Sequence, residues 1–126
     1  MKSPISISEA ESVVMDVLWR HGSMRSESVV ETLKGQQQWR ETTVKTLLGR
    51  LLHKGAIRAE KEGRRYVYSA VLTRDDWLSC ESKGLLDRLF GGRVAPLVAH
   101  FGRHGKLSKK DIAELKRMIA EMDDDD

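Results

Sequence analysis

Apolar residues recur at steps of three and four positions in three successive stretches of the N-terminal half. The first stretch runs from Ser8 to Gly22, the second covers about 26–34, and the third covers 41–54. This spacing places the apolar side chains on one face of a helix, so each stretch is predicted to be an amphipathic helix. Ser8 opens an S-x-x-E capping box, and Gly55 follows the third stretch at the position of a left-handed cap.

Two β-rich stretches come next, at about 56–60 and 65–70, on either side of a turn that contains Gly63. Strands this close together, joined by a turn glycine, are typical of an antiparallel hairpin. Met24, between the first two helices, is placed to supply a short extended segment. Three helices followed by a hairpin predict a winged helix-turn-helix over 1–72.

The C-terminal part is predicted to be helical. One helix is expected over 73–90, a short apolar segment over 94–101, and a last helix from Ser108 to 122. The acidic tail 123–126 is expected to be disordered. The predicted fold class is therefore mainly α with a small β-hairpin wing, in which a helical domain over 73–122 follows the winged-helix domain over 1–72.

The apolar residues of the C-terminal helices are more numerous than so small a region is expected to bury by itself. We therefore predict that 73–122 forms a homodimer. The residues assigned to the dimer surface are Trp77, Leu78, Leu85, Leu86, Leu89, Phe90, Ile112, Leu115, Ile119 and Met122. Two alternatives stay open: the region folds back on 1–72 as a monomer, or it serves a helical protein-interaction adaptor.

Charge separates the two halves. The whole chain of 126 residues has a net charge of +3, whereas 39–69 contains eight basic and three acidic residues, a net charge of +5. The third helix and the hairpin therefore carry the positive charge, as expected of elements that meet phosphate.

The third helix has two faces, which differ in function. Its inward stripe is predicted to comprise Val44, Leu47, Leu48, Leu51 and Leu52. At 100° per residue, small Thr side chains and Arg50 lie opposite. Short side chains let a helix approach the floor of the major groove, and basic ones bind phosphate. The predicted DNA-binding residues are Thr42, Thr43 and Thr46 for base contacts, and Arg40, Lys45, Arg50, Lys61, Arg64 and Arg65 for phosphate contacts. Tyr66 and Tyr68 are expected to pack in the core. The alternative for the helix face is an ordinary solvated surface.

Catalytic motifs are absent from the sequence. There is no nucleotide-binding G-x-x-x-x-G-K-[ST], no H-E-x-x-H and no G-x-S-x-G, so we expect neither an enzyme nor a cofactor. The single cysteine, Cys80, is expected to be a buried or half-buried helical residue, with a redox-sensing thiol as the alternative. His100 and His104 have metal-ligand spacing, but Gly102 and Gly105 are expected to interrupt the helix, so no metal site is predicted. A regulator of the same fold that responds to another signal, oxidation at Cys80 or metal, stays open as an alternative.

No apolar run approaches the roughly 18 residues that span a bilayer, and the N-terminus lacks a secretory h-region. We therefore expect a cytoplasmic protein without membrane insertion.

Several of these stretches together resemble the BlaI/MecI penicillinase repressor family. The resemblance is carried by Ile7–Glu11, Val17–Trp19, Thr42–Leu51, Lys54-Gly55, Lys61–Arg64, Tyr66–Ser69, Leu86–Gly92 and Leu107-Ser108. It extends over about residues 5–122, and the combination is specific, whereas one helix-turn-helix segment alone is not.

The resemblance implies a homodimeric repressor that binds a palindromic operator, often with TACA/TGTA-type half-sites, and controls β-lactamase or related resistance genes. It also implies release by proteolysis in the dimerisation region, triggered by a membrane sensor-protease. The matching bond here joins His100 and Phe101.

The sequence departs from the family pattern at three places, and it also lacks a feature of one branch. Arg40-Glu41 replaces the common Ser-Pro before the double Thr, and Arg25 replaces the usual Thr cap of the second helix. His100 stands where the better-known cleaved members carry Asn. The cysteine cluster of the copper-responsive branch is missing, which disfavours copper sensing by that route.

Overall fold

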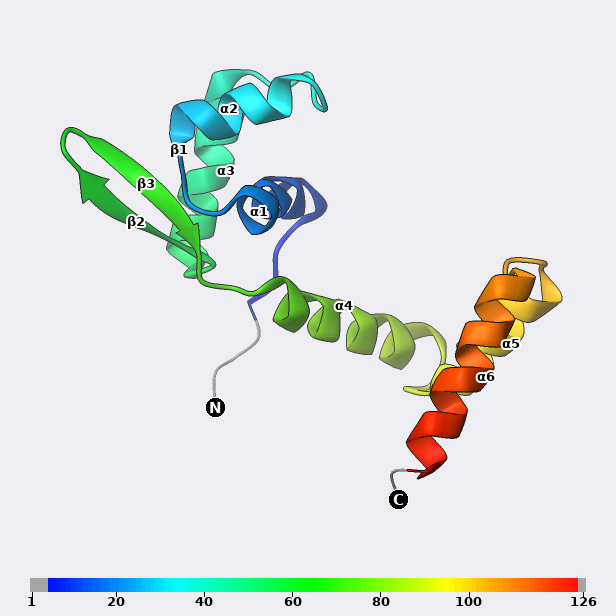
Figure 1. Ribbon diagram of the computed structural model, residues 1–126. Helices are drawn as coiled ribbons and strands as arrows, with labels where there is room; N and C mark the ends of the chain where they lie inside the picture. Colours follow the sequence, from blue (N-terminus) through cyan, green and yellow to red (C-terminus); the bar gives the residue numbers. More distant parts are fainter. Residues whose placement is uncertain (1–4, 125–126) are drawn as a thin grey trace. The chain divides into compact units, whose positions relative to one another are not determined.

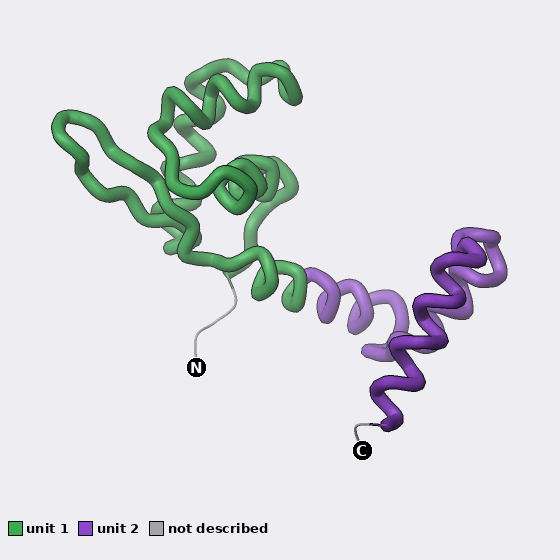
Figure 2. Tube along the Cα trace, in the orientation of Figure 1, with its two compact units in different colours: residues 1–80 green, residues 81–126 purple. Residues whose placement is uncertain are grey.

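The computed structural model describes residues 5–124, which form six helices and three short strands in two compact units (Figure 1). Unit 1 spans residues 1–80 and unit 2 residues 81–126 (Figure 2). The elements are α1 (Glu9–His21), β1 (Met24–Arg25), α2 (Ser26–Lys34), α3 (Glu41–Lys54), β2 (Ile57–Glu62), β3 (Arg65–Ala70), α4 (Arg74–Leu89), α5 (Val94–Arg103) and α6 (Lys109–Asp124). The predicted fold class is confirmed. No helix in the described range is long and apolar enough to cross a membrane.

Three helices and a small sheet enclose the core of unit 1. The buried apolar residues come from α1, α2, α3 and the start of β2, together with Ile7, Ala56 and Leu72 outside these elements. Leu51 is fully buried, whereas Leu52, which was predicted to belong to the same stripe, is 37% exposed. The predicted stripe is therefore one residue too wide, because at 100° per residue Leu52 lies at its edge.

The local signals at the helix ends are confirmed. Ser8 and Glu11 form the predicted capping box, in which each side chain accepts from the other residue's backbone N–H, at 3.1 Å for the Ser8 oxygen and 2.8 Å for the Glu11 oxygen. Gly55 adopts the left-handed conformation at φ 79°, and its N–H reaches the last turn of α3. Only glycine accepts this conformation without strain, so the helix ends here and the chain turns into β2.

The sheet has the order β1-β3-β2, with both pairs antiparallel. Met24 pairs with Tyr68, which confirms the predicted extended segment before α2. The hairpin is longer than predicted, because β2 continues to Glu62, which pairs with Arg65 across the turn at Gly63. In Figure 1 the β2–β3 hairpin projects beyond the three helices as a wing.

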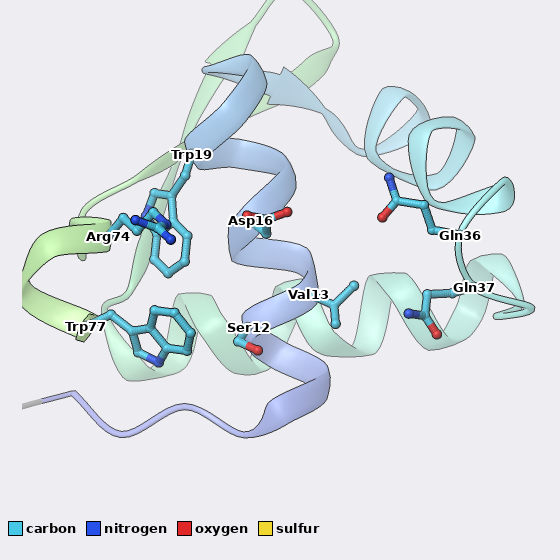
Figure 3. Close-up of a pocket in the computed structure, with 8 residues that line it drawn as sticks. All are labelled: Ser12, Val13, Asp16, Trp19, Gln36, Gln37, Arg74 and Trp77. Atoms are coloured by element: carbon cyan, nitrogen blue, oxygen red, sulfur yellow. The ribbon is translucent and has the colours of Figure 1, made fainter. Parts of the chain in front are cut away.

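Unit 1 extends past the predicted boundary at residue 72. The first turns of α4 return to α1, where the rings of Trp19 and Trp77 lie 5.3 Å apart between centroids. The Trp19 indole N–H also donates to the Leu72 carbonyl at 2.9 Å. Figure 3 shows the two indoles beside Asp16 and Arg74 at the edge of a pocket of about 350 Å³. Trp77 was assigned to the dimer surface, but its ring already has a partner in unit 1.

Unit 2 contains the rest of α4 together with α5 and α6, and none of these three helices has a buried residue. α5 continues through Gly102 to Arg103, so the predicted interruption at that glycine is wrong. α6 includes Asp123 and Asp124, which corrects the prediction that they begin a disordered tail; 125–126 lie outside the described residues. Cys80 is exposed on α4, contrary to the expected burial.

Candidate nucleic-acid interface

The outward face of α3 forms a shallow depression of about 230 Å³. Its lining comprises Thr42, Thr43, Thr46, Leu47 and Arg50. The three threonines and Arg50 are exposed, while the opposite face of the helix is buried in the core of unit 1. The structure thus brings together four of the nine predicted DNA-binding residues on one helix face. A concave surface of small side chains bordered by a guanidinium fits the edge of a duplex groove.

One hydrogen bond sets the chemistry of this depression. The Thr46 hydroxyl donates to the Thr42 carbonyl at 2.9 Å, one turn earlier in α3. With its proton used in this way, the Thr46 hydroxyl can still accept a hydrogen bond, and its methyl group can contact a thymine methyl. Thr46 therefore has the features of a residue that reads bases rather than one that only contacts phosphate.

The entry of α3 is open to an anion. Its N-cap residue, Arg40, has no acceptor in its side chain and makes no side-chain cap hydrogen bond, so this side chain does not occupy the N–H groups of the first turn. The partial positive charge of a helix N-terminus favours phosphate at this position. Arg40 itself is exposed beside these groups, which adds a full charge to the same end of the helix.

The predicted basic residues fall into two groups. Lys45 is paired with Glu41 at 3.0 Å, and Arg65 is paired with Glu27 of α2 at 3.3 Å. Within residues 5–124 no ion pair involves Arg40, Arg50, Lys61 or Arg64. The paired cations must leave a carboxylate before they can bind phosphate, whereas the others are free to do so. Exposed pairs of this kind contribute only about 0–1 kcal/mol, so DNA can displace them.

Tyr66, which was expected to pack in the core, is a surface residue of the wing. It is 52% exposed, and it lies opposite Lys61 in the strand register. The hairpin extends beyond the helices that would cover it, whereas Tyr68, two residues further along the same strand, packs against the core. β2 continues past Glu60, so the pair of Lys61 and Tyr66 lies in the projecting part of the hairpin. The length of this strand therefore explains why Tyr66 is exposed and Tyr68 is not.

An ion pair between a buried carboxylate and a partly exposed lysine fixes the far end of α3. Glu11 is 2% exposed and accepts a hydrogen bond from Lys54, the last residue of that helix. Burial alone raises the pKa of Glu11, but the hydrogen bond from Lys54, those from Ser8 and the Lys54 charge together lower this pKa below its ordinary value. Glu11 is therefore ionised at neutral pH and ties the start of α1 to the end of α3.

Three helices, a three-stranded sheet and an exposed Thr/Arg face on the third helix define a winged-helix protein of the DNA-binding class. The penicillinase repressor family model matches residues 7–121, nearly the whole chain. The protein belongs to this family, whose members regulate transcription.

Relatives of full length support this membership. A penicillinase repressor of Bacillus licheniformis is 35% identical over 121 residues, which cover 96% of this chain and 94% of the relative. A penicillinase repressor of Staphylococcus aureus is 30% identical, with 91% of each chain covered. The methicillin resistance regulatory protein MecI of Mammaliicoccus sciuri is 28% identical over 90% of this chain and 92% of its own length.

Two solved structures match the N-terminal part. The DNA-binding domain of the repressor BlaI superposes with a TM-score of 0.54 at 39% identity, over 60% of this chain and 93% of that chain. The monomeric form of Bacillus licheniformis BlaI in complex with the blaP half-operator gives a TM-score of 0.53 at the same identity and coverage. The matched share of this chain is close in size to unit 1.

Proposed function

We propose that this protein is a homodimeric transcriptional repressor in which α3 of each copy reads one half-site of a palindromic operator. The observation that supports this most directly is the exposed depression on α3, formed by Thr42, Thr46 and Arg50. BlaI, whose DNA-binding domain is 39% identical to the matched part of this chain, has been solved in complex with a half-operator. By analogy, α3 lies in the major groove and the wing reaches the flanking backbone.

Thr46 is proposed as the residue that distinguishes specific from non-specific binding. Removing its hydroxyl and methyl in Thr46→Ala should weaken binding to the operator by about 1–3 kcal/mol and leave binding to random DNA nearly unchanged. Fluorescence anisotropy on both duplexes, at one fixed salt concentration, measures the difference. Equal losses on the two duplexes would show that Thr46 reads no base.

The salt dependence of binding separates a repressor from a protein-interaction adaptor. Each phosphate contact releases counterions, so operator affinity should fall steeply with ionic strength. An adaptor with a merely solvated basic face would bind operator and random DNA equally weakly, with no preference left at physiological salt. A flat response between low and physiological salt would remove the proposed function.

Dimerisation is proposed to occur through unit 2. The apolar side chains of α4, α5 and α6 are at most half-buried in one chain, and several are largely exposed: Leu89, Val94, Ile119 and Met122. Covering such side chains is favourable in proportion to the area removed from water. Sedimentation equilibrium at micromolar concentration should give twice the chain mass, and a single-chain mass would contradict the dimer.

Control of β-lactamase or related resistance genes, and release by a membrane sensor-protease, are the further parts of the proposal. The bond proposed to be cut joins His100 and Phe101, inside α5. A protease binds its substrate in an extended form, so this turn of α5 must open before cleavage. Replacing Phe101 by Ala, which keeps the backbone hydrogen bonds of α5, should slow induction in cells that carry the sensor and leave operator binding nearly unchanged. Cleavage mapped elsewhere by mass spectrometry would refute the assignment.

A further inference from the structure

Two histidines lie side by side at the end of α5: His100 lies in the helix, and His104 is the residue that caps it. The ring centroids of His100 and His104 are 4.5 Å apart and their planes are tilted by 45°. The His104 N–H donates to the His100 carbonyl at 3.2 Å, so the two residues are joined by a regular helical hydrogen bond. Both side chains are exposed, and each ring is accessible to a dissolved ion.

The nearby glycines, which argued against a metal site at this pair, do not separate the two histidines. Gly102 lies inside α5, and the positive φ of 68° occurs only at Gly105, after the second histidine. The Lys106 N–H then returns to the Phe101 carbonyl at 2.9 Å and closes the end of the helix. The two imidazoles therefore project from adjacent turns of an ordered segment.

We propose that His100 and His104 bind a divalent transition-metal cation such as Zn²⁺. Two histidines four residues apart on a helix offer two nitrogen ligands on one face, as in helical zinc sites. Imidazole suits zinc, copper and nickel among the available cations. Within residues 5–124 no group of three or more His, Cys, Asp or Glu side chains surrounds a common point, so water completes the coordination.

The surroundings limit the affinity and the freedom of the pair. The rings of Phe90 and Phe101 lie 6.2 and 6.1 Å from the His100 ring, which restricts the positions open to that imidazole. Restriction of a ligand before binding lowers the entropy lost on binding. The positive charges of Arg103 and Lys106, close by in the sequence, repel a bound cation. The site is thus expected to be reversible rather than a permanent structural centre.

Metal binding has a mechanical consequence for α5. A cation held by both imidazoles links adjacent turns across the bond between His100 and Phe101. Opening that turn then requires loss of at least one ligand, so the bound cation should protect the bond from cleavage. This consequence bears on the proposed release step, whereas the binding itself does not depend on it.

The first experiment measures binding on the full chain, without DNA. Chelator-treated protein is titrated with ZnCl₂ by isothermal calorimetry, alongside His100→Gln and His104→Gln. His21→Gln and His53→Gln remove the other two histidines and serve as matched controls. We expect saturable binding in the wild type and both controls, and a loss of affinity of about tenfold or more in each α5 variant. Absence of saturable binding, or equal binding in all variants, overturns the site.

The second experiment tests protection by a readout that is separate from repression. The chain is digested with a protease of broad specificity, with and without ZnCl₂, and cuts in α5 are followed by mass spectrometry. Zinc should slow the cut between His100 and Phe101 in the wild type and in His21→Gln, but not in His104→Gln. Slower cleavage in all three proteins would show that zinc acts on the protease, and it would overturn the proposed protection of the bond by the bound cation. Circular dichroism checks that the variants keep their helices.

Discussion

The two units differ in where their apolar side chains lie. Unit 1 places them inside, with Val14, Met15 and Leu51 at 0% exposure, whereas α4, α5 and α6 contain no buried residue. A closed core can hold unit 1 together in one chain. Unit 2 has amphipathic helices without a buried residue, so the proposed dimer would supply the covered apolar surface that a single chain lacks.

The two parts of the proposed function, DNA recognition and dimerisation, therefore depend on different properties of the chain. DNA recognition needs a rigid helix presented at fixed geometry, which the core of unit 1 supplies through α3. Dimerisation needs an apolar surface that stays open until a second copy arrives, which unit 2 supplies. The stability of unit 2 should therefore depend on protein concentration, while that of unit 1 should not.

The largest effect is expected in the core of unit 1. Leu51→Ala removes a fully buried side chain and should lower the free energy of unfolding by about 2–5 kcal/mol. Leu52→Ala, the next residue of the same helix, is the control because Leu52 is 37% exposed. Urea denaturation followed by tryptophan fluorescence measures both variants. Equal losses would mean that unit 1 is not organised around a closed core.

The second effect tests the open surface of unit 2. Ile119→Asp places a charge on an α6 residue that is 57% exposed in one chain and assigned to the dimer. If a second copy covers it, the dimer dissociation constant should rise by about a hundredfold, equivalent to about 2.7 kcal/mol. Ala120→Asp is the control, because it adds the same charge about 100° away, at an exposed residue that is not assigned to the dimer surface. Sedimentation that is unchanged by Ile119→Asp would show that α6 is not part of the interface.

A smaller effect is expected at the ion pair between Glu11 and Lys54. Glu11→Gln keeps the shape of the side chain but leaves Lys54 without its partner, and should destabilise unit 1 by about 1–2 kcal/mol at pH 7, a range reduced because Lys54 is partly exposed. Glu9→Gln, an exposed first-turn carboxylate of α1, is the control. The mass of the dimer should be unchanged in both variants.

The pH dependence of this pair has a definite sign. The folded state lowers the pKa of Glu11 below its ordinary value near 4.5, so the native state holds the proton less tightly than the unfolded chain does. The stability contributed by Glu11 is therefore present above pH 4.5 and is lost as pH falls through the lower folded pKa. The difference between wild type and Glu11→Gln should shrink on acidification. A difference that grows at low pH would contradict the lowered pKa.

Local signals explain how much of this architecture could be predicted. The capping box at Ser8 and the glycine at Gly55 are short-range features, and the bounds of α1 and α3 follow from them. The pairing of Glu11 with Lys54 joins residues 43 positions apart, and nothing near either residue in the sequence indicates it. The return of Trp77 to Trp19, which moves the unit boundary to Cys80, is equally non-local.

The predicted recognition site shows the same limit. Helical periodicity alone grouped Thr42, Thr46 and Arg50 on the outer face of α3, and the structure confirms that grouping. The sequence did not reveal that Glu27 holds Arg65, because that ion pair depends on how α2 packs beside β3. In the sequence, Arg64 and Arg65 are equivalent wing arginines. In the structure, Arg65 is paired with Glu27, whereas Arg64 takes part in no ion pair of residues 5–124.

The different surroundings of Arg64 and Arg65 give the smallest predicted effect, a change in DNA binding that concerns unit 1 alone. Arg64→Gln should weaken operator binding and reduce the slope of log affinity against log salt by about 0.9 for each phosphate that the protein no longer neutralises. Arg65→Gln should change the slope less, because Arg65 already neutralises Glu27 at 3.3 Å. Glu27→Gln should release Arg65 from its ion pair. In that background, Arg65→Gln should then reduce the operator affinity and the salt slope as much as Arg64→Gln does in the wild type. Anisotropy titrations over a salt series, with the dimer mass checked for every variant, measure these slopes. Equal slopes for the two single arginine variants would mean that DNA displaces Glu27 at no measurable cost. A changed dimer mass would mean that a substitution in unit 1 affects the assembly proposed for unit 2.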